Sequence, residues 1–315
     1  MAWFLGFDTS NYKTSAALYD SQNGQAIGQG RFLETPAGTL GLRQSEALFQ
    51  HVRQLGEVAE ELFAQAGERR PIAAVGYSAR PRNRQDSYMP CFLAGQAAAQ
   101  TCAAVLGVPA FAFSHQQGHI SSALWSVDRL DWLEKPFLSW HLSGGTTELL
   151  LAEPCPETRL KVSRIGGTAD LAAGQVVDRA GVRLGLPFPC GIHLDKLAQR
   201  AQGEIRPFVP KSRGLEFSLS GLENKFEERI RQGAPPEETA AFVLQSIVKA
   251  VERITEQALE QYRLPLLFSG GVTASSQMQR AFAGRPEVVF AAKGCNGDNA
   301  VGAAVLAALE KGESD

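Results

Sequence analysis

The sequence has few cysteines and no surplus of charge, and both absences limit the classes of protein that it can be. Its five cysteines are scattered over 315 residues, with no Cys-x-x-Cys pair. This pattern indicates a reduced protein rather than a disulfide-stabilised secreted one. The formal net charge is −2, so the chain lacks the overall positive field of a protein that binds nucleic acid by charge alone. Local basic patches remain compatible with this charge.

The chain also lacks the hydrophobic segments of exported and membrane proteins. No run of about 18 apolar residues occurs, so we expect no membrane span. The first residues contain no basic region, and the hydrophobic stretch that they form is too short for a signal sequence. We therefore expect a cytoplasmic protein with no membrane partner. A chain of 315 residues can bury a large core and is typical of two domains or of one duplicated unit.

An alternation of strand and helix patterns occurs twice along the chain. Residues 3–7 predict a strand, 8–11 a turn and 15–19 a second strand, followed by the hairpin signal Asn23-Gly24. Residues 137–142, 143–146 and 148–152 repeat this order. Helices are predicted at 45–66, 90–106, 236–262 and 299–309, and further strands at 72–78, 110–113 and 264–268. The repetition predicts a duplicated α/β architecture with a ligand in the cleft between its halves.

Two of the five histidines, His115 and His119, stand four residues apart directly after an apolar run. Ser114 and Gln117 predict a helix capping box at this point. Residues i and i+4 share one face of a helix, so both imidazoles can reach one metal ion. With Asp298 as a third ligand, such a site suits iron(II), zinc or manganese. The alternatives are an ordinary helix start and, for Asp298, an N-cap of the last helix.

Two glycine-rich turns are candidates for binding phosphate. The first comprises Leu142, Ser143, Gly144, Gly145 and Thr146, and the second centres on Gly270 and Gly271. Backbone N–H groups without obstructing Cβ atoms can form an anion nest, and a following helix adds the positive end of its dipole. Each turn alone fits a plain hairpin or a tight strand-to-helix turn equally well. Together, in corresponding halves, they favour a nucleotide site.

Other polar residues have a functional and a structural interpretation. Asp8, at the end of the first strand, can hold metal or orient water, or form a turn. Asp178, on a predicted helix, can take ribose hydroxyls or pair with Arg179 or Arg183. His51 is interpreted as lying at the edge of a helix's core face. The hydroxyl-rich stretch 217–222 has no clear role.

The segment after the strand at 72–78 carries three arginines, Arg80, Arg82 and Arg84. Guanidinium groups suit phosphate and carboxylate, so we assign them as possible anion-binding residues. A solvated basic loop is the alternative and the commoner outcome for a run of charge.

Taken in order, these motifs resemble those of the TsaD family of tRNA threonylcarbamoyladenosine biosynthesis, also described as glycoprotease-like. The resemblance spans nearly the whole chain, through 8–10, 115–119, 143–145, 174–178, 217–222, 270–272 and 298–299. It implies an α/β, duplicated actin-like and Hsp70-like (ASKHA, RNase H-like) two-lobed fold with a central cleft. On this basis the N-terminal lobe is expected at 1–113, the C-terminal lobe at 114–294, and a helix packing back towards the N-terminal lobe at 295–315.

The resemblance also implies site residues and a reaction. A divalent metal is implied at His115, His119 and Asp298. The positions implied to contact the adenylate are the turn 142–146 and Asp178, Gly191 and Ser275. Threonylcarbamoyl-adenylate would transfer its acyl group to the exocyclic amine of a tRNA adenosine. Possible partners are therefore an adenine nucleotide, tRNA bound through a complex, and proteins of the threonylcarbamoylation pathway.

This chain departs from the family's pattern at the site. Tyr12 and Lys13 replace two acidic residues, and Gln117 replaces a glutamate. Thr146 replaces a histidine and Ser275 an asparagine, while the arginine segment replaces a glycine-rich loop. We therefore expect a diverged paralogue, with Asp8 and Lys13 as candidate catalytic residues and a pocket for a more anionic substrate.

Three functions are compatible with these motifs. The first is a metal-dependent, nucleotide-binding acyl or carbamoyl transferase. The second is a non-catalytic nucleotide-binding paralogue that acts as a partner protein, which the lost acidic residues favour. The third is a sugar-kinase-like ATPase, which needs the phosphate turns but not the histidine pair. A metalloprotease is disfavoured because Gln116 stands where the zinc-protease helix has its catalytic glutamate.

Overall fold

The computed structural model describes residues 2–10, 12–35, 42–67, 70–84, 86–292 and 299–314. The chain divides into two compact units. Unit 1 comprises residues 1–135, 153–162 and 294–315, and unit 2 comprises 136–152 and 163–293. Each unit is therefore assembled from separate stretches of the chain, and each has a sheet of its own.

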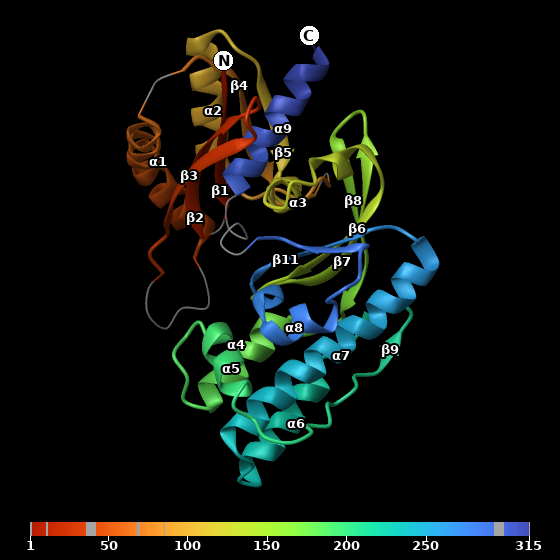
Figure 1. Cartoon of the computed structure of the whole chain (residues 1–315). Coiled ribbons are helices and arrows are strands. Elements are labelled where there is room, and N and C mark those ends of the chain that lie inside the picture. Colours follow the sequence, from red (N-terminus) through yellow and green to blue (C-terminus); the bar gives the residue numbers. More distant parts are fainter. Residues whose placement is uncertain are drawn as a thin grey trace. The chain divides into compact units, whose positions relative to one another are not determined.

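The sheet of unit 1 has the strand order β3-β2-β1-β4-β5 (Figure 1). Its strands are β1 (Trp3–Ser10), β2 (Lys13–Asp20), β3 (Gln25–Phe32), β4 (Ile72–Arg80) and β5 (Ala110–Ser114). The first three strands are antiparallel, joined through the predicted Asn23-Gly24 hairpin, and β4 and β5 run parallel to β1. The carboxyl ends of β1, β4 and β5 therefore meet at one edge of the sheet.

Helices cover both faces of this sheet because its strands are apolar on both sides. Leu5 and Phe7 pack with α1 (Gln44–Ala66) and α2 (Phe92–Leu106). Gly6 points to the opposite face, since side chains alternate along a strand, and there it meets α9 (Asn299–Ser314). α3 (His115–Trp125) packs on α9, and the short helix η1 (Leu130–Glu134) follows it.

The sheet of unit 2 has the strand order β12-β11-β6-β7-β8-β10-β9. Its strands are β6 (Phe137–Leu142), β7 (Thr147–Cys155), β8 (Arg159–Thr168), β9 (Ser212–Arg213), β10 (Glu216–Phe217), β11 (Leu266–Ser269) and β12 (Val288–Phe290). Its helices are α4 (Ala173–Arg183), α5 (Gly191–Ala198), α6 (Ser220–Arg231), α7 (Pro236–Tyr262), η2 (Gly271–Ala274) and α8 (Ser276–Ala281). Apolar side chains of these helices and of β6, β7 and β11 form one core.

The two sheets share one connection pattern, which confirms the predicted duplication. The order β3-β2-β1-β4-β5 of unit 1 matches β8-β7-β6-β11-β12 of unit 2. In both, the first strand pairs antiparallel with the second and parallel with a later strand that returns after a helical segment. The glycine turn 143–146 thus occupies in unit 2 the place that the end of β1 has in unit 1.

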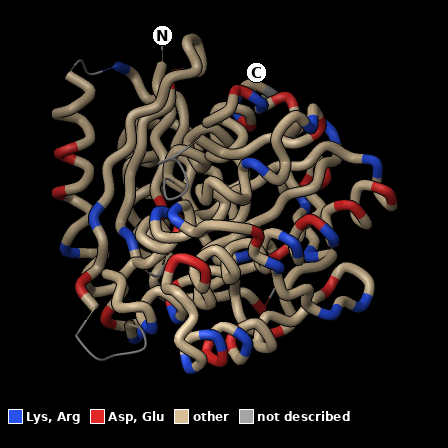
Figure 2. Tube along the Cα trace, turned by 60° about the horizontal axis from the view of Figure 1, so that its bottom comes forward, with Lys and Arg blue, Asp and Glu red and all other residues tan. Residues whose placement is uncertain are grey.

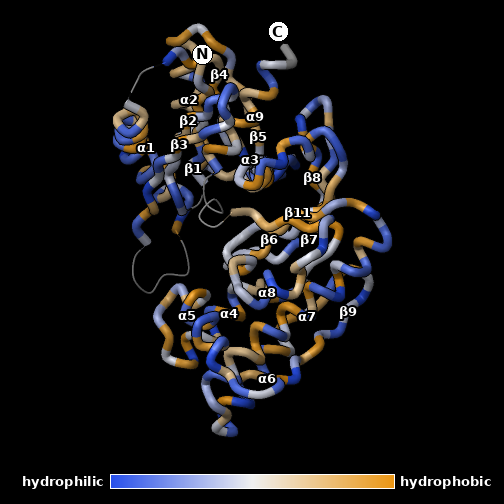
Figure 3. Tube along the Cα trace, in the orientation of Figure 1, coloured by the Kyte–Doolittle hydropathy of each residue, from blue (hydrophilic) through white to orange (hydrophobic). Residues whose placement is uncertain are grey.

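Helix α7 was predicted with the bounds that it has, 236–262. Apolar and polar residues alternate along it (Figure 3), and its apolar face joins the core of unit 2. Among the described helices, none combines the length and the apolar character that a membrane crossing requires.

Candidate functional site

The two histidines of the metal motif begin a helix whose start is fixed by side-chain capping. β5 leads directly into α3, so His115 is the first residue of the helix. The Ser114 hydroxyl oxygen accepts a hydrogen bond from the backbone N–H of Gln117 at 3.2 Å. In return, the side-chain Oε1 of Gln117 accepts one from the backbone N–H of Ser114 at 2.7 Å. The predicted capping box is confirmed. It fixes the start of the helix that carries both imidazoles.

His115 is oriented by a buried carboxylate. Its Nδ1 lies 2.7 Å from Asp8 Oδ2, and the Asp8 side chain is 1% exposed. Burial would raise the pKa of the Asp8 carboxyl, but the charge and hydrogen bond of His115, with Ser78 and His119, hold that pKa well below its usual range. Asp8 is therefore ionised. Because its carboxylate occupies Nδ1 of His115, Nε2 is the ring nitrogen through which His115 can bind a ligand.

The ring of His119 lies beside that of His115. Their centroids are 4.4 Å apart and the ring planes are nearly perpendicular. The i, i+4 spacing has therefore placed the imidazoles together, as the sequence predicted. Within the described residues, no three His, Cys, Asp or Glu side chains surround one point as a metal site would need. The third predicted ligand, Asp298, lies outside the described residues.

Helix α9, which follows Asp298 in the chain, starts against the histidine helix. A Cβ atom on Gly118 would lie 3.1 Å from the carbonyl oxygen of Asn299. Asn299 is 6% exposed, and its Oδ1 is buried with no hydrogen-bond partner in the part of the chain that the structure describes. Asn299, the residue after Asp298 in the sequence, therefore packs against Gly118, which directly precedes His119 on α3.

In unit 2, the turn after β6 is closed by its own hydrogen bonds. The Ser143 N–H donates to Thr146 O at 2.8 Å, and the Thr146 N–H donates to Ser143 Oγ at 3.1 Å. A Cβ atom on Gly144 or Gly145 would meet nothing within 4 Å. Packing within the unit therefore does not require glycine here, whereas the close approach of a ligand to the backbone would.

The two predicted phosphate turns lie together. Gly270 has a φ of +97°, and a Cβ atom there would come within 2.3 Å of the Leu142 carbonyl oxygen. Only glycine fits such a contact and such a φ. The turn after β11, at Gly270, thus packs directly on the turn after β6. The short helix η2 begins at the next residue, Gly271. The N–H of Gly174, in α4, also donates to Ser143 O at 3.2 Å.

Asp178 and Ser275 both hold the position of α5. Asp178 Oδ1 accepts a hydrogen bond from the Cys190 N–H at 2.9 Å, directly before Gly191. Ser275 donates its hydroxyl proton to Asp195 Oδ1 at 2.8 Å. The alternative partners expected for Asp178 are used elsewhere: Arg179 pairs with Glu223 and Arg183 with Glu227, both on α6.

The predicted basic residues each have their own local contacts. The Lys13 side chain lies over Gly30 of β3, where a Cβ atom added to the glycine would be 3.0 Å from Lys13 Nζ. Asp8 lies on β1, on the other side of β2 from β3. Arg84 pairs with Asp86 at 3.4 Å, and both side chains are exposed. The Arg82 N–H donates to Ser87 Oγ. Arg80 Nε is buried without a hydrogen-bond partner among the described residues.

Three polar contacts were not anticipated from the sequence. Asp170 accepts hydrogen bonds from the Leu219 N–H at 2.8 Å and from the Ser218 hydroxyl, which gives the 217–222 motif a structural role. His51 is fully buried, not at the edge, with Nδ1 2.8 Å from Thr14 Oγ1. Gln117 Nε2 donates to the carbonyls of Thr158 and Leu160. Each contact joins residues far apart in sequence, so no local pattern marks it.

Lysine and arginine are interspersed with aspartate and glutamate along the trace (Figure 2). Much of this charge is locally paired, as in Arg31 with Glu57 and Glu61, and Lys135 with Asp131. Exposed pairs of this kind contribute little to stability, on the order of 0–1 kcal/mol each.

A protein-family model matches most of the chain. Residues 36–297 match the TsaD model, described as tRNA N6-adenosine threonylcarbamoyltransferase. Among curated proteins, the tRNA N6-adenosine threonylcarbamoyltransferase of Bordetella avium (strain 197N) is 32% identical over 297 residues, 89% of this chain and 81% of that protein.

Solved structures share the fold at low sequence identity. The activator of the 2-hydroxyisocaproyl-CoA dehydratase from Clostridium difficile, with bound ADPNP, aligns with a TM-score of 0.54 and 15% identity over 99% of this chain and 96% of that one. A ROK family glucokinase from Streptomyces griseus, in complex with glucose and AMPPNP, aligns with a TM-score of 0.51 and 14% identity over 98% and 100%. The fold is thus the expected ASKHA type.

Proposed function

Because the chain belongs to the TsaD family of tRNA N6-adenosine threonylcarbamoyltransferases, we propose that it transfers a threonylcarbamoyl or related carbamoyl group from an acyl-adenylate to an acceptor amine. The proposal includes one divalent metal ion, iron, zinc or manganese, and an adenine nucleotide as ligand. The family's acceptor is a tRNA adenosine. We propose that tRNA reaches this chain through a complex with other proteins of the pathway, because its own net charge is −2.

His115, His119 and Asp298 are the proposed metal ligands. The observation that carries this assignment is the Asp8–His115 hydrogen bond of 2.7 Å with the His119 ring alongside. A carboxylate on one ring nitrogen is the usual support of a metal-binding histidine, since it fixes the tautomer and directs the other nitrogen to the metal. The contact of Asn299 with Gly118 supports Asp298 as the third ligand. When bound, the metal would polarise the acyl-phosphate donor as a Lewis acid.

The proposed nucleotide site uses the two packed glycine turns, 142–146 and 270–271, with Asp178, Gly191 and Ser275. The open space at Gly144 and Gly145 leaves their N–H groups accessible to phosphate oxygens. Asp178 fixes the start of α5, and with it Gly191, through the Cys190 N–H. The ADPNP bound to the dehydratase activator supports this assignment at the level of the fold.

In the proposed reaction the acceptor amine attacks the carbonyl carbon of the acyl-adenylate. A C–N bond forms, the C–O bond to the phosphate breaks, AMP leaves, and the amine proton passes to water. Asp8 acts through His115 as a positioning residue, because its low pKa makes it a poor base. Lys13, Arg80, Arg82 and Arg84 are proposed to bind an anionic part of the substrate.

The decisive experiment measures metal content and turnover in the same preparation. The protein is purified without chelator, its metals are quantified, and threonylcarbamoyl-adenylate is supplied with unmodified tRNA. We expect one metal per chain and a modified tRNA product. His115→Ala should abolish both, whereas the control His193→Ala, at an exposed position of α5, should preserve both.

The outcomes separate the remaining functions. Full metal occupancy without product on tRNA would contradict transfer to tRNA and favour the non-catalytic partner protein. Hydrolysis of ATP that depends on a sugar, with no effect of His115→Ala, would favour the kinase-like alternative instead.

A further inference from the structure

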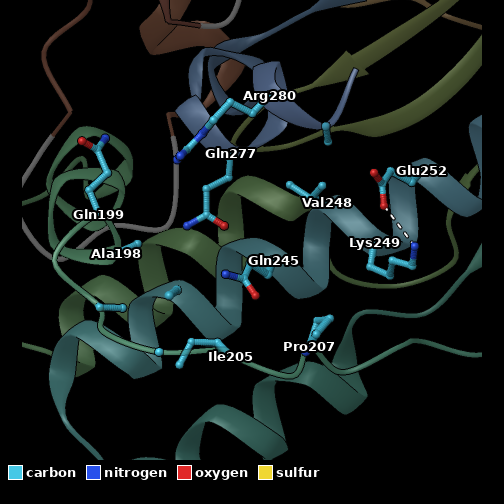
Figure 4. Close-up of a pocket in the computed structure, with 14 residues that line it drawn as sticks. Ala198, Gln199, Ile205, Pro207, Gln245, Val248, Lys249, Glu252, Gln277 and Arg280 are labelled. Atoms are coloured by element: carbon cyan, nitrogen blue, oxygen red, sulfur yellow. Dashed lines mark hydrogen bonds and ion pairs between the residues drawn. The ribbon is translucent and has the colours of Figure 1, made fainter. Parts of the chain in front are cut away.

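A cavity of about 540 Å³ lies within unit 2, apart from the residues assigned above to the nucleotide and the metal (Figure 4). It lies among α5, α7, α8 and the stretch 201–207. Small-molecule sites in proteins typically enclose about 300–1,000 Å³. The cavity is therefore large enough for a ligand the size of a nucleoside monophosphate.

The walls of this cavity, here called the amide pocket, combine apolar side chains with primary amides. Ala241 and Val248 of α7 line the pocket and are buried. Gln245 comes from α7 and Gln277 from α8, and Figure 4 shows Gln277 extending toward Gln245. Apolar lining with a few polar amides suits a planar ring whose edge carries hydrogen-bonding atoms.

The amides of Gln245 and Gln277 are available to a ligand. Both side chains are partly buried, and within the described residues neither has a hydrogen-bond partner. Each primary amide offers an acceptor oxygen and two N–H donors. This donor–acceptor pair matches the edge of a nucleobase, which glutamine and asparagine can bind with two hydrogen bonds.

Arg280 supplies a cation at the rim of the pocket. Its Nε donates to Ser276 O at 3.1 Å and its Nη2 donates to Ser276 Oγ at 3.2 Å. These contacts hold the guanidinium in place and leave its remaining N–H groups for an anion. The other lining cation, Lys249, pairs with Glu252 at 3.3 Å. Arg280 is thus the better candidate for a phosphate.

We propose that the amide pocket is a second ligand site, which binds a nucleoside monophosphate by its base edge on Gln245 and Gln277 and by its phosphate on Arg280. The carboxylate of Asp195 connects the amide pocket to Ser275, which was assigned to the nucleotide site. Gln199, which lines the pocket, donates to Asp195 Oδ2 at 2.9 Å, while Ser275 donates to Asp195 Oδ1 at 2.8 Å. Occupancy of the pocket therefore changes the environment of Ser275.

Calorimetric titration of the full chain tests this proposal. The probes are UMP, CMP, AMP and GMP, with ribose 5-phosphate as the probe that lacks a base, each titrated with and without excess ADPNP. We expect at least one of the four monophosphates to bind about tenfold more tightly than ribose 5-phosphate, because the base adds hydrogen bonds. ADPNP should leave this binding in place, since it would occupy the other site.

Matched variants locate the binding. Gln277→Leu should weaken the monophosphate about tenfold, and Arg280→Gln should weaken the monophosphate and ribose 5-phosphate alike. Gln279→Leu is the control, since Gln279 lies on the same helix outside the pocket lining. Thermal melting of each variant verifies that it is folded.

Two results would overturn the proposal. One is the absence of binding by all four monophosphates. The other is binding that Gln277→Leu leaves unchanged and that ADPNP displaces, which would assign the monophosphate to the glycine turns. A failure of the proposed transferase activity has a different signature, because the binding measured here needs neither metal nor tRNA.

Discussion

The side chain of Gln117 joins two segments of unit 1 that are far apart in sequence. It caps the start of α3 through Ser114 and donates its amide protons to the carbonyls of Thr158 and Leu160, in the stretch 153–162. It is 2% exposed. A glutamate could accept the hydrogen bond from Ser114 but could not donate to the two carbonyls. This explains physically why the chain carries glutamine where the family's pattern has glutamate.

We predict that Gln117→Glu lowers the free energy of unfolding by about 2–3 kcal/mol, because it leaves buried carbonyls unpaired beside a carboxylate. Urea unfolding of the full chain measures the change. Gln116→Glu, which places the same charge one residue earlier, should change stability by less than about 0.5 kcal/mol. Equal losses in both variants would attribute the effect to charge near α3 and not to the two hydrogen bonds.

Residues that act over short sequence distances were predictable, and those that act over long distances were not. The capping box of Ser114 and Gln117 follows from residues three apart, and the proximity of His115 and His119 follows from the helical spacing. The partner of His115, Asp8, is 107 positions away. Asp8 was singled out by its place at a strand end, but its role as the partner of an imidazole depends on how β1 and α3 pack, which no local pattern encodes.

At the scale of elements, α9 holds unit 1 together by close backbone contacts. A Cβ atom on Gly302 would come within 1.9 Å of the Gly118 carbonyl oxygen, and one on Gly6 or Gly76 within 2.0 or 2.1 Å of α9 carbonyls. Small residues at these crossings let the helix approach both α3 and the sheet. This approach is what places Asn299 against the histidine helix.

We predict that Gly302→Ala destabilises unit 1 by about 1–3 kcal/mol, since the added methyl group must displace backbone. Gly312→Ala, in the same helix with nothing within 4 Å of its Cβ position, should instead stabilise by about 0.5–1 kcal/mol through helix propensity. Thermal unfolding of both variants distinguishes the two signs. A stabilising Gly302→Ala would contradict the close packing.

Most elements with strong periodicity were predicted close to their observed bounds, including α1 and α7. The short strands β9, β10 and β12 have two or three residues each and carry too little pattern to be recognised. Residues 8–10 were predicted as a turn but extend β1. Their polar side chains are satisfied by tertiary partners, such as Cys91 O for the Thr9 hydroxyl at 2.9 Å, and tertiary packing overrides their local turn preference.

At the scale of the whole molecule, each unit has a core of its own. Among the described residues, the core that β6, β7 and β11 form with helices α4–α8 contains residues between 138 and 290. The core between the unit 1 sheet and helices α1 and α2 contains residues up to 108. Helix α9 covers the other face of that sheet, where Ala300, Ala303 and Ala304 are fully buried. Loss of α9 would therefore expose one face of unit 1, and it would remove no residue of the core that helices α4–α8 form with the unit 2 sheet.

Deletion of residues 299–315 should remove hydrogen-exchange protection from β1 and β4 while β6 and β11 keep theirs. The reason is that β1 and β4 lose the helix that shields one face, whereas α9 contributes no residue to the described core that β6 and β11 form with helices α4–α8. Peptide-level hydrogen exchange of the deleted and full-length chains measures this directly. Fast exchange throughout the deleted chain would mean that the units do not fold separately.

The order of the chain has a consequence for its biosynthesis. Domains of a nascent protein generally fold from the N-terminus onward, as each is translated. Unit 1 cannot follow that rule, because α9 is translated only after every residue of unit 2. The ribosome therefore delivers a complete unit 2 while β1 and β4 still expose an uncovered face. Until α9 emerges, the N-terminal sheet is the part of the nascent chain most in need of a chaperone.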